Sequence, residues 1–211
     1  MNEIGRSHVA RGDLFEIRRM LVRAGGFDGY RAAPVAWSGG LALMAGVIQR
    51  WATPSPAGFV ALWVATAAAS FAINVIGIAR TYGASPRQWE RSLAFAALLD
   101  LMPAIVGGGV ITAALLMRGQ PELLPGTWMI FYGSGVMVSR RHVPRGCAWI
   151  GLAYVLAGGA TLCLLPAANA LRADVMAGAF CVGQFVLAAV LSRAAEGEPA
   201  VGTAVRSEGD A

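Results

Sequence analysis

The way charge is distributed along the chain constrains the fold more than any other feature of the sequence. Charged side chains fall in short clusters, and apolar stretches of about 16 to 26 residues separate the clusters. Only 14% of the 211 residues are charged, whereas about a quarter are charged in an ordinary soluble domain. Apolar helices of this length can cross a hydrocarbon core about 30 Å thick. The pattern therefore predicts a multi-pass membrane protein.

The apolar stretches predict an all-α fold, a bundle of six transmembrane helices. Lipid-facing segments must satisfy their backbone hydrogen bonds internally, and these stretches lack the alternation of barrel strands. The first and fourth are short, and the fourth spans only about 24 Å at about 1.5 Å per residue. We expect the fourth to stand nearly upright, to thin the bilayer or to dip in and return. The predicted spans are residues 34–48, 57–79, 92–117, 123–138, 147–168 and 175–192.

Two further segments flank the predicted transmembrane domain of residues 34–192. Residues 1–33 contain a basic amphipathic helix, in which Asp13 caps the start and Glu16 stands three residues later. Its apolar and charged side chains occupy opposite faces, which favours a helix lying on the inner leaflet. A docking helix for a cytoplasmic protein partner is the alternative. Residues 193–211 are small, polar and acidic, and we expect them to be disordered.

The arginines predict the orientation in the membrane. The chain has 17 strongly basic residues and all of them are arginine. Fourteen fall on one side of the predicted membrane, and only Arg50, Arg118 and Arg172 fall on the other. The positive-inside rule then places both termini in the cytoplasm, as expected for a protein of the bacterial inner membrane. The arginines are spread over four segments without a recognition motif, so we expect no nucleic-acid partner.

The residues that most membrane enzymes need are scarce in this sequence. Without lysine, no retinal Schiff base can form, and His8 and His142 both fall in predicted cytoplasmic segments, which argues against membrane haem and buried metal. The cysteines Cys147, Cys163 and Cys181 are isolated from one another, so a membrane thiol oxidoreductase is not expected. We therefore expect no cofactor and no metal, and the absence of a catalytic constellation weighs against an enzyme.

One ionisable residue, Asp100, interrupts the third predicted span. Counting from the cytoplasmic edge at about 1.5 Å per residue places Asp100 about 12 Å deep. The same count gives depths of about 8 to 12 Å for polar residues of four other spans. These four are Asn74, Tyr132, Tyr154 and Gln184. The sequence thus predicts an intramembrane polar layer from five helices. Asp100 has two alternative roles in this layer: it is protonated or hydrogen-bonded and holds helices together, or it is a proton-linked or ligand-binding site.

The residues after Asp100 predict a kinked helix. Pro103 removes a backbone hydrogen bond beside Asp100, and the three glycines at 107–109 let another helix approach or the segment bend. Transporters use such kinks to build sites at the middle of the membrane, but kinks also occur in helices that only pack.

Two stretches carry a resemblance. The sequence EIRRMLVRAGGFDG before the first span and LLPGTWMIFYGSGVMV in the fourth resemble uncharacterised small bacterial six-span membrane proteins. These share a basic amphipathic N-terminal helix and an LPGTW…YG pattern, and their genes often neighbour winged-helix regulators. The fourth-span pattern falls on Leu124, Pro125, Gly126, Thr127, Trp128, Tyr132 and Gly133. The resemblance implies no particular activity, although a regulatory neighbour hints at sensing.

Three classes of function are compatible with these observations. The first is a non-enzymatic inner-membrane component that binds a partner or a small apolar ligand. It agrees with a clearly predicted helix bundle that has few titratable side chains. A small transporter using the layer around Asp100 is the alternative, and it predicts a cavity that reaches Asp100. An intramembrane enzyme fits least well. Beyond the lipid bilayer, a membrane or cytoplasmic protein partner and a homo-oligomer are left open.

Overall fold

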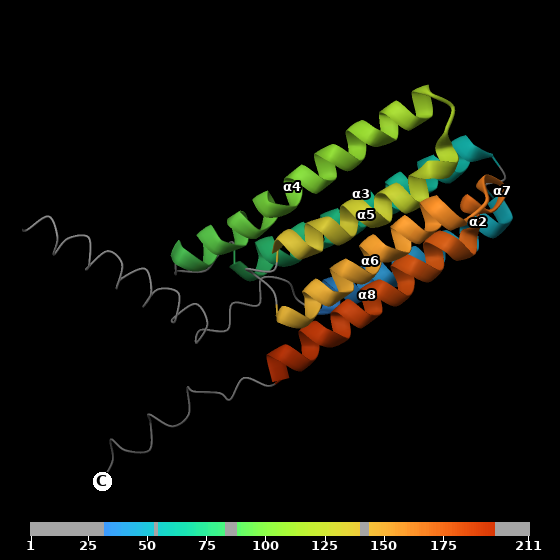
Figure 1. The fold of residues 1–211 in the computed structure, drawn as a ribbon. Helices are drawn as coiled ribbons and strands as arrows, with labels where there is room; N and C mark the ends of the chain where they lie inside the picture. Colours follow the sequence, from blue (N-terminus) through green and yellow to red (C-terminus); the bar gives the residue numbers. More distant parts are fainter. Residues whose placement is uncertain (1–31, 53–54, 83–87, 140–143, 197–211) are drawn as a thin grey trace, which may run out of the picture.

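The computed structural model describes residues 32–52, 55–82, 88–139 and 144–196. The predicted N-terminal amphipathic helix, both histidines and most of the predicted disordered tail lie outside these ranges. No strand occurs in the described part of the chain, which consists of helices joined by short connections (Figure 1). The helices are α2 (Ala32–Ala52), α3 (Pro56–Tyr82), α4 (Gln88–Met117), η1 (Pro121–Leu123), α5 (Leu124–Val138), α6 (Arg145–Leu164), α7 (Ala167–Ala170) and α8 (Ala173–Glu196).

Five of these helices are long and apolar enough to cross a membrane, so the chain is a multi-pass membrane protein. They are α2, α3 as far as Arg80, the part of α4 from Leu99 to Met117, α6 from Gly146 and α8 as far as Ala194. The helix of the fourth predicted span, α5, has only 15 residues. Five helices are therefore candidate membrane spans by length and composition, and the sixth crossing stays a prediction.

The predicted spans and the helices differ in length, and two of the differences have a local explanation. The first, expected to be short, becomes a helix of 21 residues, because buried Gln49 near its end is hydrogen-bonded and does not stop it. The fifth was expected to reach residue 168, but α6 ends at Leu164. The next residue, Leu165, is extended and precedes Pro166, and a residue before proline is disfavoured in the helical conformation.

Local capping explains where two other helices begin and end. The Ser55 hydroxyl accepts a hydrogen bond from the Gly58 backbone N–H at 3.1 Å, just ahead of the proline that starts α3. At the end of α4, Gly119 adopts a positive φ of 67°. The Gln120 N–H donates to the Leu115 carbonyl at 2.9 Å and the Gly119 N–H to the Leu116 carbonyl at 3.1 Å, which is a Schellman ending. Between its ends, α4 continues as one helix through Pro103.

Glycines set the tightest helix pair, α5 with α6. A methyl group added at Gly158 would lie 2.5 Å from the Gly126 carbonyl oxygen, and one added at Gly126 would lie 2.7 Å from the Gly158 carbonyl oxygen. Gly133 and Gly151 face each other in the same way one heptad along. The two backbones therefore touch along an antiparallel seam, which only glycine permits at these four positions.

A second antiparallel pair, α2 with α8, is also built on glycines. A methyl group added at Gly39 would lie 3.2 Å from the Gln184 Cβ, and Gly46 faces Ala177 seven residues along. Between the two tight pairs, Tyr154 of α6 packs against Gly183 of α8. These contacts join α5, α6, α8 and α2 into a continuous wall.

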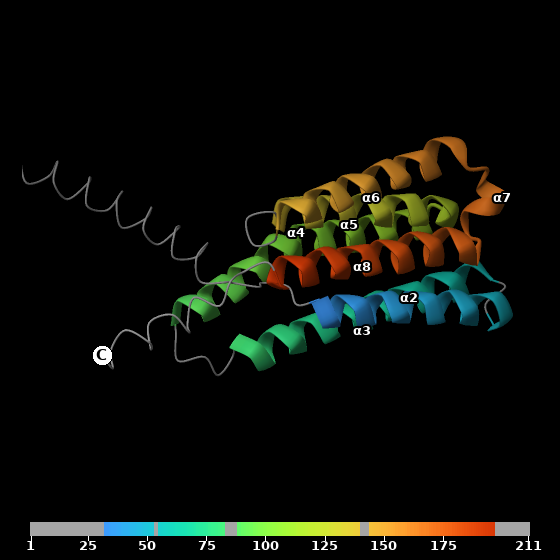
Figure 2. The ribbon, with the colours of Figure 1, turned by 90° about the horizontal axis from the view of Figure 1, so that it is seen from below.

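The remaining helices close the bundle incompletely. Around the bundle the order is α4, α5, α6, α8, α2, α3, and α3 and α4 contact each other less than any other neighbouring pair. Figure 2 shows α2 and α3 on one side and α4, α5 and α6 on the other, with α8 between them. The start of α2 and the end of α8 lie at the same end of the bundle (Figure 1). A space inside the bundle is thus left between α3 and α4.

Candidate functional site

A cavity of about 530 Å³ occupies this space. All six long helices contribute to its lining, α6 through Cys147 alone. Along α8 the lining extends from Met176 to Leu191, a rise of about 22 Å at about 1.5 Å per residue. The cavity is therefore elongated along the helices, and its walls are mostly aliphatic and aromatic.

The polar groups of the lining are all uncharged. Among the described residues, no arginine, aspartate, glutamate or histidine lines the cavity. The hydroxyl and amide side chains that do so come from five helices. They are Ser38, Thr66, Ser70, Asn74, Thr112, Tyr132, Ser139 and Gln184.

One wall of the cavity holds a hydrogen-bonded pair between α2 and α3. The Asn74 Nδ2 donates to the Ser38 Oγ at 3.0 Å and to the Ser70 carbonyl at 2.8 Å. The Ser38 Oγ in turn donates to the Pro34 carbonyl at 3.1 Å. Because the Ser70 carbonyl can only accept, it fixes the nitrogen of the Asn74 amide on that side. The amide oxygen is therefore left facing away from these partners.

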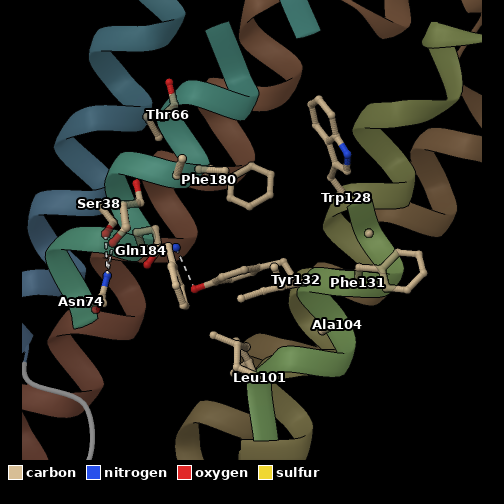
Figure 3. A pocket seen from close by; sticks show the side chains of 18 of the residues that line it. Ser38, Thr66, Asn74, Leu101, Ala104, Trp128, Phe131, Tyr132, Phe180 and Gln184 are labelled. Carbon is tan, nitrogen blue, oxygen red and sulfur yellow. Dashed lines mark hydrogen bonds between the residues drawn. The ribbon is translucent and has the colours of Figure 1, made fainter. Parts of the chain in front are cut away.

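Gln184 of α8 lies beside this pair. Its Nε2 donates to the Tyr132 Oη at 2.7 Å, so an amide on α8 meets a phenol on α5 across the bundle. Figure 3 shows Ser38, Asn74 and Gln184 gathered on one wall, with the Tyr132 ring reaching towards them from the other. The absence of a side chain at Gly39 leaves room for Gln184 to pass. We call Ser38, Asn74, Tyr132 and Gln184 the polar belt.

Tyr154 packs behind the polar belt. Its ring meets the Tyr132 ring edge-on at 4.9 Å and the Phe180 ring at 5.3 Å. The Tyr154 hydroxyl is buried and has no hydrogen-bond partner in the described part of the chain. Tyr154 does not line the cavity. It therefore supports Tyr132 from behind and does not face the cavity itself.

Asp100 lies at another height. Leu101 and Ala104 of α4 pack against Gly135 of α5, which puts half-buried Asp100 level with the end of α5 near Ser139. Tyr132 is seven residues further along, about 10 Å at about 1.5 Å per residue. The cavity lining includes Leu101 and does not include Asp100. The structure thus brings Tyr132, Tyr154 and Gln184 together and places Asn74 beside them, while Asp100 lies towards one end of the bundle.

Several polar residues with structural roles were missed by sequence reasoning. Gln49 of α2 accepts a hydrogen bond from the Trp63 Nε1 at 2.7 Å and donates to the Leu171 carbonyl at 2.6 Å. Trp128 donates to the Thr112 Oγ1 at 2.8 Å across α4 and α5. A glutamine at the edge of an apolar stretch is a signal that could have drawn attention. Ser38 and Thr112 give no such signal, because small hydroxyl residues bond to their own helix in most spans.

The fold and the site define a class, the polytopic helical membrane proteins with an internal apolar cavity. No protein-family model matches the chain, and neither a curated protein nor a solved structure matches it. The resemblance to small bacterial six-span proteins carried by the LPGTW…YG stretch stays a prediction. No group of three or more side chains suited to hold a metal ion occurs within the described ranges.

Proposed function

We propose that this protein binds a small apolar ligand taken up from the bilayer and acts as a regulatory or sensory component without catalysing a reaction. The single observation that carries the proposal is the elongated apolar cavity of about 530 Å³ with its neutral polar belt. Sites for small molecules typically enclose about 300 to 1,000 Å³, with apolar walls and a few polar groups that orient the ligand.

The cavity has an entrance on the lipid-facing side of the bundle. Val64 of α3 is 47% exposed and Ile105 of α4 is 41% exposed, yet both line the cavity. Gly109 of α4 is likewise exposed and lines it. These residues lie on the two neighbouring helices that contact each other least. A ligand dissolved in the bilayer can therefore enter between α3 and α4 without crossing water.

We place this site in a bacterial inner membrane, with six crossings and both termini in the cytoplasm. The antiparallel seam of α5 with α6 supports counting α5 as a crossing, and the two ends of the described bundle lie together (Figure 1). The distribution of arginine supports the orientation. Transport through a layer around Asp100 is the weaker proposal, because Asp100 does not line the cavity, although the neighbouring Leu101 does.

The test uses the tryptophans of the cavity as reporters. Trp63 and Trp128 line it, whereas Trp37 and Trp149 are 69% and 74% exposed outside it. One variant keeps Trp63 and Trp128 and has the other four tryptophans replaced by phenylalanine, and a second keeps Trp37 and Trp149 only. Bromine quenches indole fluorescence at short range. Titrating 9,10-dibromooctadecane into proteoliposomes should quench the first variant saturably and the second in proportion to bilayer loading.

A side chain that fills the cavity should remove the saturable quenching of the cavity tryptophans. A side chain added at Gly108 meets only Phe131, at 3.9 Å, so Gly108→Leu occupies the cavity without a backbone clash. Gly159→Leu on α6 is the matched control, because a side chain there meets nothing within 4 Å and does not line the cavity. Saturable quenching that survives Gly108→Leu, or that never appears with the cavity reporters, refutes ligand binding at this site.

A further inference from the structure

We infer that the ligand carries an uncharged hydroxyl within an elongated apolar chain, and that the amide oxygens of Asn74 and Gln184 accept its hydrogen bond. The inference rests on the proposed function and names the chemical class of the ligand. It follows from three properties of the cavity: the hydrogen-bonding groups left over on the polar belt, the charge of the lining and the position of the belt along the cavity.

The hydrogen bonds of the polar belt leave acceptors unused. Both hydrogens of the Asn74 amide are engaged, one with Ser38 and one with the Ser70 carbonyl. The Gln184 amide donates to Tyr132. No described residue donates to the Asn74 Oδ1 or the Gln184 Oε1, and neither oxygen is among the fully enclosed atoms without a partner. In an apolar environment, an amide oxygen without a hydrogen-bond donor costs free energy. A donor group on the ligand that reaches these two oxygens removes that cost.

The two amides are close enough to serve one donor group. Ser38, which bonds to Asn74, is followed in α2 by Gly39, which packs against the Gln184 Cβ. The figure of the cavity shows both amides on the same wall (Figure 3). A hydroxyl can donate its hydrogen to an amide oxygen and accept the second hydrogen of the Gln184 amide, so it can pair with both kinds of group. A ketone or an ether presents lone pairs only and would meet the amide oxygens unfavourably.

The lining also selects against a charged group. Among the described residues, the cavity offers no cation to a carboxylate or phosphate and no carboxylate to an amine. A charge taken from water into such a site loses its hydration without a partner. A fatty acid or a phospholipid headgroup is therefore a poor occupant of the belt.

The position of the belt determines where the hydroxyl lies on the chain. Gln184 is eight residues from Met176 at one end of the lining and seven from Leu191 at the other. At about 1.5 Å per residue, roughly 10 to 12 Å of cavity extends to each side of the belt. Phe180 lines the first half, and Leu187 lines the second. A hydroxyl near the middle of a long apolar chain lets both arms be buried while the polar group meets the belt.

The experiment compares five chains of equal length as competitors of 9,10-dibromooctadecane in proteoliposomes of the variant that keeps Trp63 and Trp128. The probes are octadecan-9-ol, octadecan-1-ol, octadecan-9-one, octadecane and octadecanoic acid. We expect octadecan-9-ol to compete about tenfold better than octadecane, as one net hydrogen bond allows. Octadecan-1-ol should fall between them, and the ketone and the acid should compete no better than octadecane.

Two substitutions locate the hydrogen bond. Gln184→Met keeps an unbranched side chain of similar length and removes the amide. Asn74→Leu removes the amide on the other helix and keeps a side chain of similar size and shape. Each should reduce the advantage of octadecan-9-ol over octadecane to about threefold or less. Gln120→Met is the matched control, because it makes the same change at an exposed glutamine outside the cavity lining. It should leave the advantage unchanged.

The outcomes separate the two proposals. Equal competition by octadecan-9-ol, octadecan-9-one and octadecane overturns the hydroxyl inference while the proposed function stands. An advantage of octadecan-9-ol that persists in both Gln184→Met and Asn74→Leu also overturns the inference. Saturable quenching that no probe relieves, or that is absent altogether, overturns the proposed function itself.

Discussion

The seam between α5 and α6 gives the sharpest test of the packing. At Gly158, an added methyl group would lie 2.5 Å from the Gly126 carbonyl oxygen and 3.0 Å from the Ile130 backbone nitrogen. Ordinary contact of a Cβ begins at 3.4 Å, so in Gly158→Ala the two helices must move apart by about 0.9 Å. Both near atoms belong to the backbone and cannot rotate away. We expect a loss of about 1–3 kcal/mol in the free energy of unfolding, as for other overpacked cores.

The neighbouring glycine provides a control of opposite sign. A methyl group at Gly159 meets nothing within 4 Å, so Gly159→Ala only restricts the unfolded chain and favours helix, which stabilises by about 0.5–1 kcal/mol. Both variants can be measured by unfolding in mixed micelles with increasing sodium dodecyl sulfate, followed by circular dichroism. Equal stability of the two variants, or a stabilised Gly158→Ala, would refute the close backbone seam.

Three other predictions follow from the bundle. Gly183→Ala should lower the free energy of unfolding by about 1–3 kcal/mol, because the added carbon would lie 2.6 Å from the Tyr154 Cε2. A carbon added at Gly178 meets nothing within 4 Å, so Gly178→Ala should not destabilise the protein, and the same micelle assay measures both variants. Gln49→Met should cost about 2 kcal/mol, since it leaves the Trp63 indole N–H and the Leu171 carbonyl without their partner, and a melting point equal to that of the unsubstituted protein would contradict the bond network. Reporter fusions test the orientation: periplasmic signals are expected after Arg50, Arg118 and Arg172, cytoplasmic signals after Arg80, Arg141 and Arg193, and one reversed site would remove a crossing.

The sequence was informative about individual helices and less so about their ends. Hydropathy and the absence of alternation predicted an all-helical membrane protein because each span must satisfy its own backbone bonds, whatever its neighbours are. The end of α6 was missed by four residues, although Pro166 marks it. The length of α2 was missed because Gln49 and Trp51 look like the edge of a membrane span, and only contacts with Trp63 and Leu171 explain why the helix continues.

The depth of the polar residues could also be counted from the sequence. Rise per residue is constant in a helix, so the distance of Tyr132, Tyr154 and Gln184 from the ends of their spans follows directly. What the count could not supply is the direction of each side chain around its helix. Tyr132 faces the cavity and Tyr154 packs behind it, although both had similar counted depths.

Membrane placement was determined by the sequence alone, whereas the cavity was decided by tertiary structure. Lipid tails are as apolar as leucine, so hydropathy separates membrane from water but does not say which helix neighbours which. The glycines at 126, 133, 151 and 158 stand seven residues apart within each helix, yet their pairing becomes visible only when α5 and α6 lie antiparallel. Those close contacts and the seam of α2 with α8 bury the small-residue faces of four helices. The α3 and α4 helices are left with few mutual contacts, and the cavity forms there because nothing in the sequence of either helix fills the space between them.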